Sequence, residues 1–225
     1  MRLKLVIFDV DGTLVDSQAD ILGSMNGAFE AQGLKTPDRE AILGIVGLSL
    51  DVAMLKLAPQ AGTAVRAELV EGYKRTYMQR REAVGTKESS PLYPGARAAL
   101  DRLRARDDIL LGVATGKSRR GLDKLIEGHG LDGYFQTRQV ADDHPSKPHP
   151  SMIFAALSET GMEHVDAVMV GDTSYDMDMA QAAGVAGLGV SWGYHPASAL
   201  KSARAMVDDF SALDEALGQL FGETA

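Results

Sequence analysis

The chain has 225 residues, of which 45% are hydrophobic, so it can form one large domain or a core with a moderate insert. Its 31 acidic and 23 basic residues give a formal net charge of -8, which argues against nucleic acid or an anionic membrane as a partner. The absence of cysteine excludes disulfides and thiol catalysis. The first apolar run stops at Asp9, too short for a signal peptide or a membrane span, so we predict a cytoplasmic protein.

The N-terminal stretch predicts a buried strand that ends in two acids. Residues 5–8, Leu-Val-Ile-Phe, are continuously apolar, which is typical of a central parallel strand covered on both faces. Asp9 ends this strand, and Asp11 follows in a turn that Gly12 permits. Ligands of open parallel sheets bind at the carboxyl ends of the strands, so this acidic pair is a candidate for chemistry.

The next stretch predicts helices and no strand. Apolar spacing indicates a helix over residues 17–32, with Ser17 as its N-cap and Gly33 as its stop, and further helices over 38–43, 49–57 and 64–83. Residues 85–94 read as a polar linker that contains Pro and Gly. We therefore predict a helical cap domain over residues 17–90, inserted after the first strand of a catalytic core formed by 1–16 and 91–225.

From Gly95 onward the pattern alternates between helices and strands, which indicates an α/β fold with a doubly wound parallel sheet. Helices are predicted over residues 96–106, 119–127, 151–159, 177–183 and 211–221, and strands over 109–114, 135–140, 167–170, 186–190 and 205–207. The strand ends would supply Asp9, Thr115 and Asp172 to one edge of the sheet.

Four short motifs follow in a specific order. They are Asp-Val-Asp-Gly-Thr at 9–13, Thr-Gly at 115–116, Lys147 between Ser and Pro, and Gly-Asp-Thr-Ser-Tyr-Asp at 171–176. Together they resemble the four motifs of the haloacid dehalogenase-like hydrolase superfamily, and the chain looks most like its phosphoglycolate phosphatase-like branch. The resemblance spans the whole chain, because the helical insert matches the helical cap of that family.

The motifs suit phosphoryl transfer. A phosphate monoester is a poor electrophile surrounded by negative charge, so a catalyst must neutralise its oxygens, align a nucleophile and protonate the leaving group. Asp9 is the candidate nucleophile, forming an aspartyl-phosphate. Asp11 is the candidate general acid and then base, in a crowded acidic pocket expected to raise its pKa.

The acidic residues also predict a metal site. Two carboxylates about 4 Å apart repel by roughly 4 kcal/mol at an effective dielectric near 20, so Asp9, Asp172 and Asp176 would not cluster without a cation. All-oxygen ligation together with a substrate phosphate points to Mg2+. The resemblance implies that Asp9 and the backbone carbonyl of Asp11 complete the ligand set, with Asp172 direct and Asp176 either direct or one layer further out.

Other residues are assigned to phosphate binding. Thr115 and the backbone of Gly116 and Lys117 would donate hydrogen bonds to the transferring phosphoryl group, and Lys147 would neutralise its charge and orient Asp9. The side chains of Lys117, Arg119 and Arg120 either reach a second anionic group or face solvent. Asp142 and Asp143 either support Lys147 or are loop acids without a role in the site. We interpret His144 and His149 as loop residues rather than zinc ligands. Trp192 either lines the pocket or packs against other side chains.

The leading hypothesis is a magnesium-dependent phosphatase for a small phosphorylated metabolite, with phosphoglycolate the first substrate to test. The cap loop 44–49 that would contact the leaving group has no basic residue to bind a carboxylate, which leaves the substrate open. Inorganic pyrophosphatase and sugar phosphomutase activities remain alternatives on the same core. The alternative from another functional class is a non-catalytic, receiver-like signalling domain that accepts a phosphoryl group. The sequence does not indicate an oligomeric state.

Overall fold

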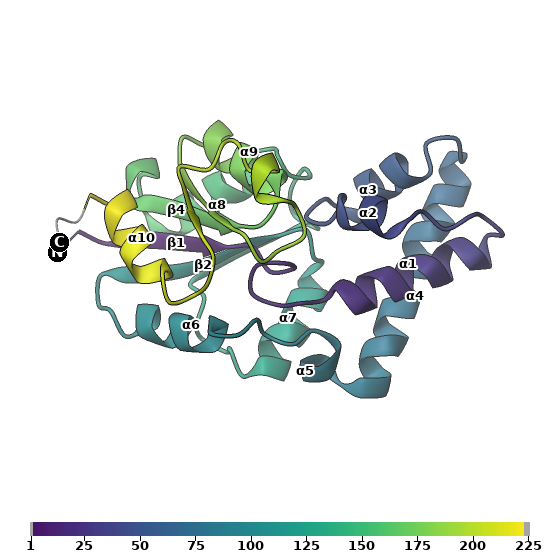
Figure 1. The fold of residues 1–225 in the computed structure, drawn as a ribbon, viewed down its shortest axis with the longest axis horizontal. Helices are drawn as coiled ribbons and strands as arrows, with labels where there is room; N and C mark the ends of the chain where they lie inside the picture. Colours follow the sequence, from purple (N-terminus) through teal and green to yellow (C-terminus); the bar gives the residue numbers. More distant parts are fainter. Residues whose placement is uncertain (1, 223–225) are drawn as a thin grey trace.

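The computed structural model describes residues 2–222 and has a parallel sheet with a helical insertion after its first strand (Figure 1). The strands are β1 Lys4–Phe8, β2 Ile109–Thr115, β3 Thr137–Val140, β4 Ala167–Gly171, β5 Ala186–Val190 and β6 Ala205–Val207. The six strands are all parallel, in the order β3-β2-β1-β4-β5-β6. The predicted doubly wound sheet is confirmed.

The helices form two sets, one within the insertion and one that alternates with the strands after it. The insertion contains α1 Gln18–Ala31, α2 Arg39–Leu43, α3 Leu50–Leu57, α4 Thr63–Val84 and α5 Thr86–Ser89. The helices that follow are α6 Ala96–Arg104, α7 Arg119–His129, α8 Ser151–Thr160, α9 Ser174–Ala182 and α10 Leu213–Leu220, with short 3-10 turns η1 His164–Asp166 and η2 Ala197–Ala199. No helix in residues 2–222 is long and apolar enough to cross a membrane.

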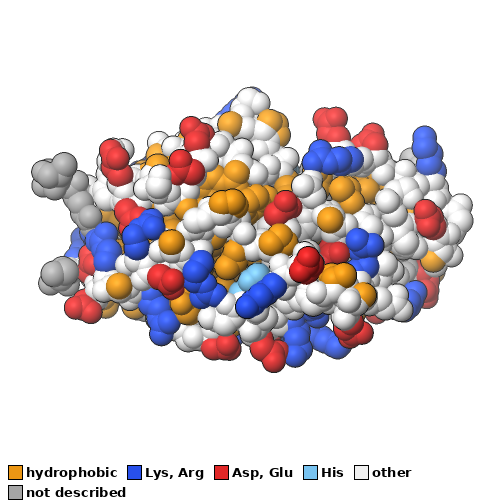
Figure 2. All heavy atoms as spheres, turned by 60° about the horizontal axis from the view of Figure 1, so that its bottom comes forward, with side chains coloured by type: hydrophobic (Ala, Val, Ile, Leu, Met, Phe, Trp, Pro, Cys, Tyr) orange, Lys and Arg blue, Asp and Glu red, His pale blue; other side chains and the backbone are white. Residues whose placement is uncertain are grey.

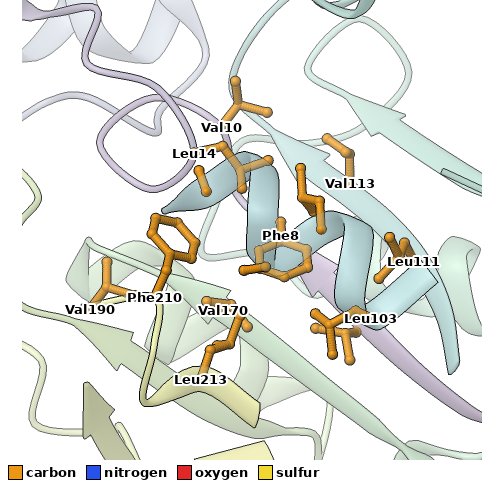
Figure 3. Close-up of a cluster of buried hydrophobic side chains, with 14 of the residues drawn as sticks. Phe8, Val10, Leu14, Leu103, Leu111, Val113, Val170, Val190, Phe210 and Leu213 are labelled. Atoms are coloured by element: carbon orange, nitrogen blue, oxygen red, sulfur yellow. The ribbon is translucent and has the colours of Figure 1, made fainter. Parts of the chain in front are cut away.

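Strand β1 is buried on both faces, as its continuous apolar run predicts. Successive side chains of a strand point to opposite faces. Val6 and Phe8 belong to a cluster with residues of α6, α7 and α10, and Figure 3 shows Phe8 close to Leu103 of α6. Leu5 and Ile7 belong to a second cluster on the other face, with residues of α8 and α9. Helices therefore cover both faces of the sheet.

The insertion has a hydrophobic core of its own. Met25 and Phe29 of α1 pack with Leu69 of α4 in a cluster separate from the two clusters of the sheet. The approach of these helices is close, because a Cβ on Gly72 would lie 3.4 Å from the backbone of Ala28. Figure 1 places α1–α4 together at the end of the molecule away from the two termini, and β1 runs toward them. The boundaries 1–16, 17–90 and 91–225 stay a prediction.

The largest differences from the sequence prediction concern α5 and α9. The predicted linker contains the short helix α5, which follows Gly85. Helix α9 begins at Ser174, three residues before the predicted start at Met177, because Thr173 and Asp176 form a capping box in which each side chain pairs with the backbone of the other residue. Asp176 is therefore part of the first turn of α9 rather than of the preceding loop.

Candidate active site

The carboxyl ends of β1, β2 and β4 lie next to one another and carry the predicted site residues. Asp9 follows β1, Thr115 ends β2, and Asp172 follows β4. β1 is hydrogen-bonded to β2 on one side and to β4 on the other, so the chain switches sides of the sheet at β1. Open parallel sheets bind ligands at such a switch in strand order.

The turn after β1 depends on Gly12. This residue has φ +88°, in the left-handed region that favours glycine. A Cβ at this position would lie 2.2 Å from Oδ2 of Asp172, so a side chain would collide with the acidic motif that follows β4. Gly12 thus allows the two acidic motifs to approach each other.

Three buried carboxylates form one group at this edge. Oxygens of Asp9, Asp172 and Asp176 all lie within 4.8 Å of one another. The three residues are 0–1% exposed. Oδ2 of Asp9 is buried and has no hydrogen-bond partner among the described residues. A buried carboxylate oxygen without a partner is costly, so this oxygen is suited to contact a cation or another ligand.

Lys147 reaches this group from the loop before α8. Its Nζ donates to Oδ1 of Asp9 and to Oδ1 of Asp176, each at 2.7 Å, and its side chain is fully buried. Asp142 and Asp143 do not support it; they pair with the backbone N–H and the side chain of Arg119. The possibility that these two acids support Lys147 is therefore wrong.

Burial sets the protonation of the group. Burial, opposed by Lys147, raises the pKa of Asp9 to about 7. Burial and the neighbouring Asp9 and Asp176 carboxylates raise the pKa of Asp172 well above its ordinary value. Burial lowers the pKa of Lys147, but Asp176 and Asp9 outweigh this effect, so its pKa is raised and it stays charged.

The donor set fits a divalent cation. Three carboxylates and one ammonium group leave a formal charge of -2, which one divalent ion would neutralise. The side-chain ligands are all oxygens, the type that Mg2+ prefers. Both oxygens of Asp176 already accept hydrogen bonds, from Lys147 and from Thr173. Asp9, with its free Oδ2, is the best placed of the three to ligate directly.

Asp11 has different surroundings from those predicted. Its Oδ1 lies 2.8 Å from Nζ of Lys117 and also accepts a hydrogen bond from Ser17 Oγ. The observed partners of the Asp11 side chain are therefore a cation and a hydroxyl group rather than another carboxylate. The side chain of Lys117 was expected either to reach a second anionic group or to face solvent, but it bridges Asp11 and the hydroxyl of Tyr77 in α4, 3.2 Å away.

Several residues that orient the acids were not predicted. Thr13 Oγ1 donates to Asp172 Oδ1 at 3.0 Å, and the backbone N–H of Tyr194 donates to Asp172 Oδ2 at 2.7 Å. Thr173 holds Asp176 through the capping box. The Thr-x-x-Asp spacing of residues 173–176 was a readable signal of this cap, and Thr13 lies within the first motif. Nothing in the local sequence indicated Tyr194, because its partner is 22 residues away.

The cap loop 44–49 lies against the core. A Cβ on Gly116 would lie 2.7 Å from the carbonyl oxygen of Gly47, so the two loops touch through their backbones. The hydroxyl of Tyr175 donates to the carbonyl of Gly44 at 2.9 Å, and the N–H of Ser49 donates to Ser146 at 2.9 Å. The loop predicted to contact the leaving group therefore lies beside the segment that is predicted to bind phosphate.

The remaining candidates have structural partners. His144 lies between Ser151 and Gln139, 2.8 Å from each, and no group of potential metal ligands in residues 2–222 includes a histidine. Trp192 packs on Phe210, with ring centroids 4.6 Å apart, and donates to the carbonyl of Thr13. Its observed contacts are therefore a ring contact and a hydrogen bond, and it is not among the residues that line the cavity at Asp9.

A family model described as haloacid dehalogenase-like hydrolase matches residues 6–190. The chain belongs to this family. "Probable phosphatase IndB" of Dickeya dadantii is 37% identical over 212 residues, covering 92% of this chain and 90% of the relative. Phosphoglycolate phosphatase of Rhodospirillum rubrum is 34% identical over 225 residues, covering 96% and 91%.

The fold of this haloacid dehalogenase-like hydrolase is shared with solved structures. The crystal structure of a hydrolase from Pseudomonas syringae matches with a TM-score of 0.84 at 22% identity, covering 96% of this chain and 98% of that one. The predicted family and the helical insertion after the first strand are thus confirmed.

Proposed function

We propose that this haloacid dehalogenase-like hydrolase is a magnesium-dependent phosphatase that hydrolyses a small phosphomonoester through an aspartyl-phosphate. The observation that carries the proposal is the free, buried Oδ2 of Asp9, beside two further carboxylates and Lys147 at the carboxyl edge of the sheet. The phosphatase names of the relatives support the same reaction class.

Asp9, Asp172 and the backbone carbonyl of Asp11 would hold the magnesium ion, with Asp176 beside it. The bound ion would neutralise negative charge on the carboxylates and on the substrate phosphate. Thr13 and the N–H of Tyr194 fix Asp172 for this task, and Thr173 fixes Asp176.

In the first step a carboxylate oxygen of Asp9 attacks phosphorus. The bond between phosphorus and the leaving oxygen breaks as the new Asp9–phosphorus bond forms, and Asp11 donates a proton to the leaving alcohol. In the second step Asp11 takes a proton from water, whose oxygen attacks phosphorus and releases Asp9 and inorganic phosphate. Ser17 and Lys117 hold the Asp11 carboxylate in position through its Oδ1.

The segment after β2 would bind the phosphoryl oxygens. Thr115 and the backbone N–H groups of Gly116 and Lys117 precede α7, whose N-terminus favours negative charge. Lys147 orients Asp9 through a 2.7 Å hydrogen bond and supplies a fixed positive charge.

The test is release of phosphate from p-nitrophenyl phosphate with magnesium and with a chelator. We expect release only with the metal, and its loss in Asp9→Asn. Asp178→Asn is the matched control, because Asp178 is an exposed acid of α9 that accepts from Ser202. Equal rates for the wild type and Asp9→Asn would refute the proposal.

A panel of phosphorylated compounds tests which substrate the enzyme prefers. Phosphoglycolate comes first, because several relatives carry the name phosphoglycolate phosphatase. Inorganic pyrophosphate and a sugar phosphate test the two alternatives on the same core. The kcat/KM of each compound with magnesium ranks them.

A further inference from the structure

A large cavity extends from the candidate active site into the insertion. Its volume is about 570 Å³, and Asp9, Asp11 and Thr115 line one end of it. Such a volume lies within the roughly 300–1,000 Å³ of sites that enclose drug-sized ligands. A phosphoryl group at Asp9 would therefore have its leaving group in this cavity, and the two-carbon glycolate of phosphoglycolate would leave most of it unfilled.

The walls that the first half of the insertion contributes are apolar. Ile21 and Met25 come from α1, and Ile45, Val46 and Leu48 come from the loop between α2 and α3. All five side chains are 0–8% exposed. These walls can be shielded from water by an apolar ligand, but they offer a carboxylate no side-chain hydrogen bond.

Helix α4 completes the cavity with aromatic rings and Met78. Tyr73 and Tyr77 lie one turn apart with ring centroids 5.9 Å apart and an interplanar angle of 30°. Three cations of α4 also line the cavity: Lys74 and Arg75 are exposed, and Arg81 is half-buried. Two of these three charges therefore lie at the rim of this wall. On the face drawn in Figure 2, hydrophobic side chains are interspersed with acidic and basic ones, in contrast to the apolar walls inside.

The ammonium group of Lys117 at the Asp11 end of the cavity already has two partners. Lys117 lines the cavity, but its Nζ is 2.8 Å from Asp11 and 3.2 Å from the hydroxyl of Tyr77. A glycolate carboxylate would have to share this ammonium group with Asp11 while lying against apolar walls. Burying an incompletely paired carboxylate is unfavourable.

On the basis of the phosphatase function proposed above, we propose that the cavity selects phosphomonoesters of apolar alcohols, aliphatic or aromatic, that are larger than glycolate. Selectivity comes from removing the apolar leaving group from water, because the cavity offers few polar groups that could recognise a polar leaving group. The residues of the insertion set this preference for apolar leaving groups, whereas the acids at the sheet edge act on any phosphomonoester.

The first experiment compares methyl, butyl and hexyl phosphate with phosphoglycolate. The leaving alcohols of the alkyl series have similar reactivity, so differences in kcat/KM report the cavity. We expect kcat/KM to rise by up to about fourfold per added methylene, which corresponds to ~0.8 kcal/mol for each buried CH2. A series that does not rise, or a phosphoglycolate value above that of hexyl phosphate, would overturn the inference and leave the phosphatase function standing.

A binding measurement separates the cavity from the chemistry. Methyl-, butyl- and hexylphosphonate are titrated calorimetrically into the magnesium-loaded protein, because these compounds have no cleavable P–O–C bond. Affinity that rises with chain length supports the apolar site even if no phosphate ester is hydrolysed, a result that would refute only the proposed function. Equal affinities for the three phosphonates would overturn the apolar site whatever the rates are.

A pair of matched variants locates the effect. Met78→Gln keeps the volume of a half-buried side chain of the cavity but makes it polar, and it should lower the hexyl-to-methyl ratio of kcat/KM by at least about threefold. Met162→Gln makes the same change at a half-buried methionine that packs against α8, away from the cavity lining, and should leave the ratio unchanged. Methyl phosphate reports whether each variant is folded. A ratio that Met78→Gln does not change would contradict the assignment of this wall.

Discussion

Replacing Lys147 by methionine should destabilise the protein strongly, although the two side chains have similar size. The ammonium group is fully buried and makes 2.7 Å hydrogen bonds to both Asp9 and Asp176. Its removal takes away the cation that both side chains contact inside the protein. Breaking a buried ion pair costs ~3–5 kcal/mol. At about 2–4 °C per kcal/mol for a chain of this size, the Tm should fall by roughly 6–20 °C.

The assay is thermal unfolding in a chelating buffer, with Lys124→Met as the control. Lys124 pairs with Glu127 at 2.6 Å, but its side chain is 53% exposed, so water replaces the lost partner. We expect the control to change the Tm by no more than about 2 °C. Saturating magnesium should reduce the deficit of Lys147→Met, because the cation neutralises the same carboxylates.

A double-mutant cycle measures the coupling between Lys147 and Asp176. Combining Lys147→Met with Asp176→Asn removes one of the carboxylates that the lysine neutralises. The double variant should therefore be more stable than the sum of the two single effects, by about 0.5–3 kcal/mol. Additive effects, or a Tm for Lys147→Met equal to that of the Lys124→Met control, would refute the view that this ammonium group holds the acids together.

Three further predictions follow from the same site. Gly12→Ala forces φ +88° on a residue with a Cβ that would lie 2.2 Å from Asp172, so we expect a loss of stability of ~1–3 kcal/mol by chemical denaturation and a large loss of kcat. In the metal-free protein the pKa of Asp9 is raised to about 7. The folded state therefore keeps a proton that the unfolded chain has lost, and the free energy of unfolding should fall as the pH rises from about 4 to about 7. Magnesium competes with that proton, so it should raise the Tm more at about pH 8 than at about pH 5, and an equal effect at both would contradict the ligand role. Lys117→Met removes the cation 2.8 Å from Asp11; we expect kcat to fall because the Asp11 side chain loses a positioning partner, and an unchanged kcat would show that Lys117 does not act through Asp11.

The fold was predictable because periodicity and motif order agree. The continuous apolar run of β1 indicated a strand covered on both faces, and the helix-only pattern after Asp16 indicated the insertion. The start of α9 was missed because Thr173 and Asp176 were interpreted as loop residues, whereas their side chains form a capping box that begins the helix. The helix α5 was missed because four residues give no periodicity.

The acids of the site were predictable, but their partners were less so. Asp9 and Asp172 follow strands and Thr115 ends one, so a parallel sheet brings them to one edge. Thr13 and Asp172 are 159 residues apart, and no local pattern indicates their hydrogen bond. The ion pair of Lys117 with Asp11 was missed for a related reason: a basic residue at the start of a helix is compatible with solvent, and only the three-dimensional structure brings it to the turn after β1.

The most direct test of the account is to identify the residue that becomes phosphorylated. Asp11→Asn lacks the base for the second step, so mixing it with magnesium and p-nitrophenyl phosphate, quenching in acid and sequencing the peptides by mass spectrometry should find phosphate on Asp9. Phosphate on a different residue, or phosphate release by Asp11→Asn at the wild-type rate without any phosphorylated Asp9, would contradict the central claim.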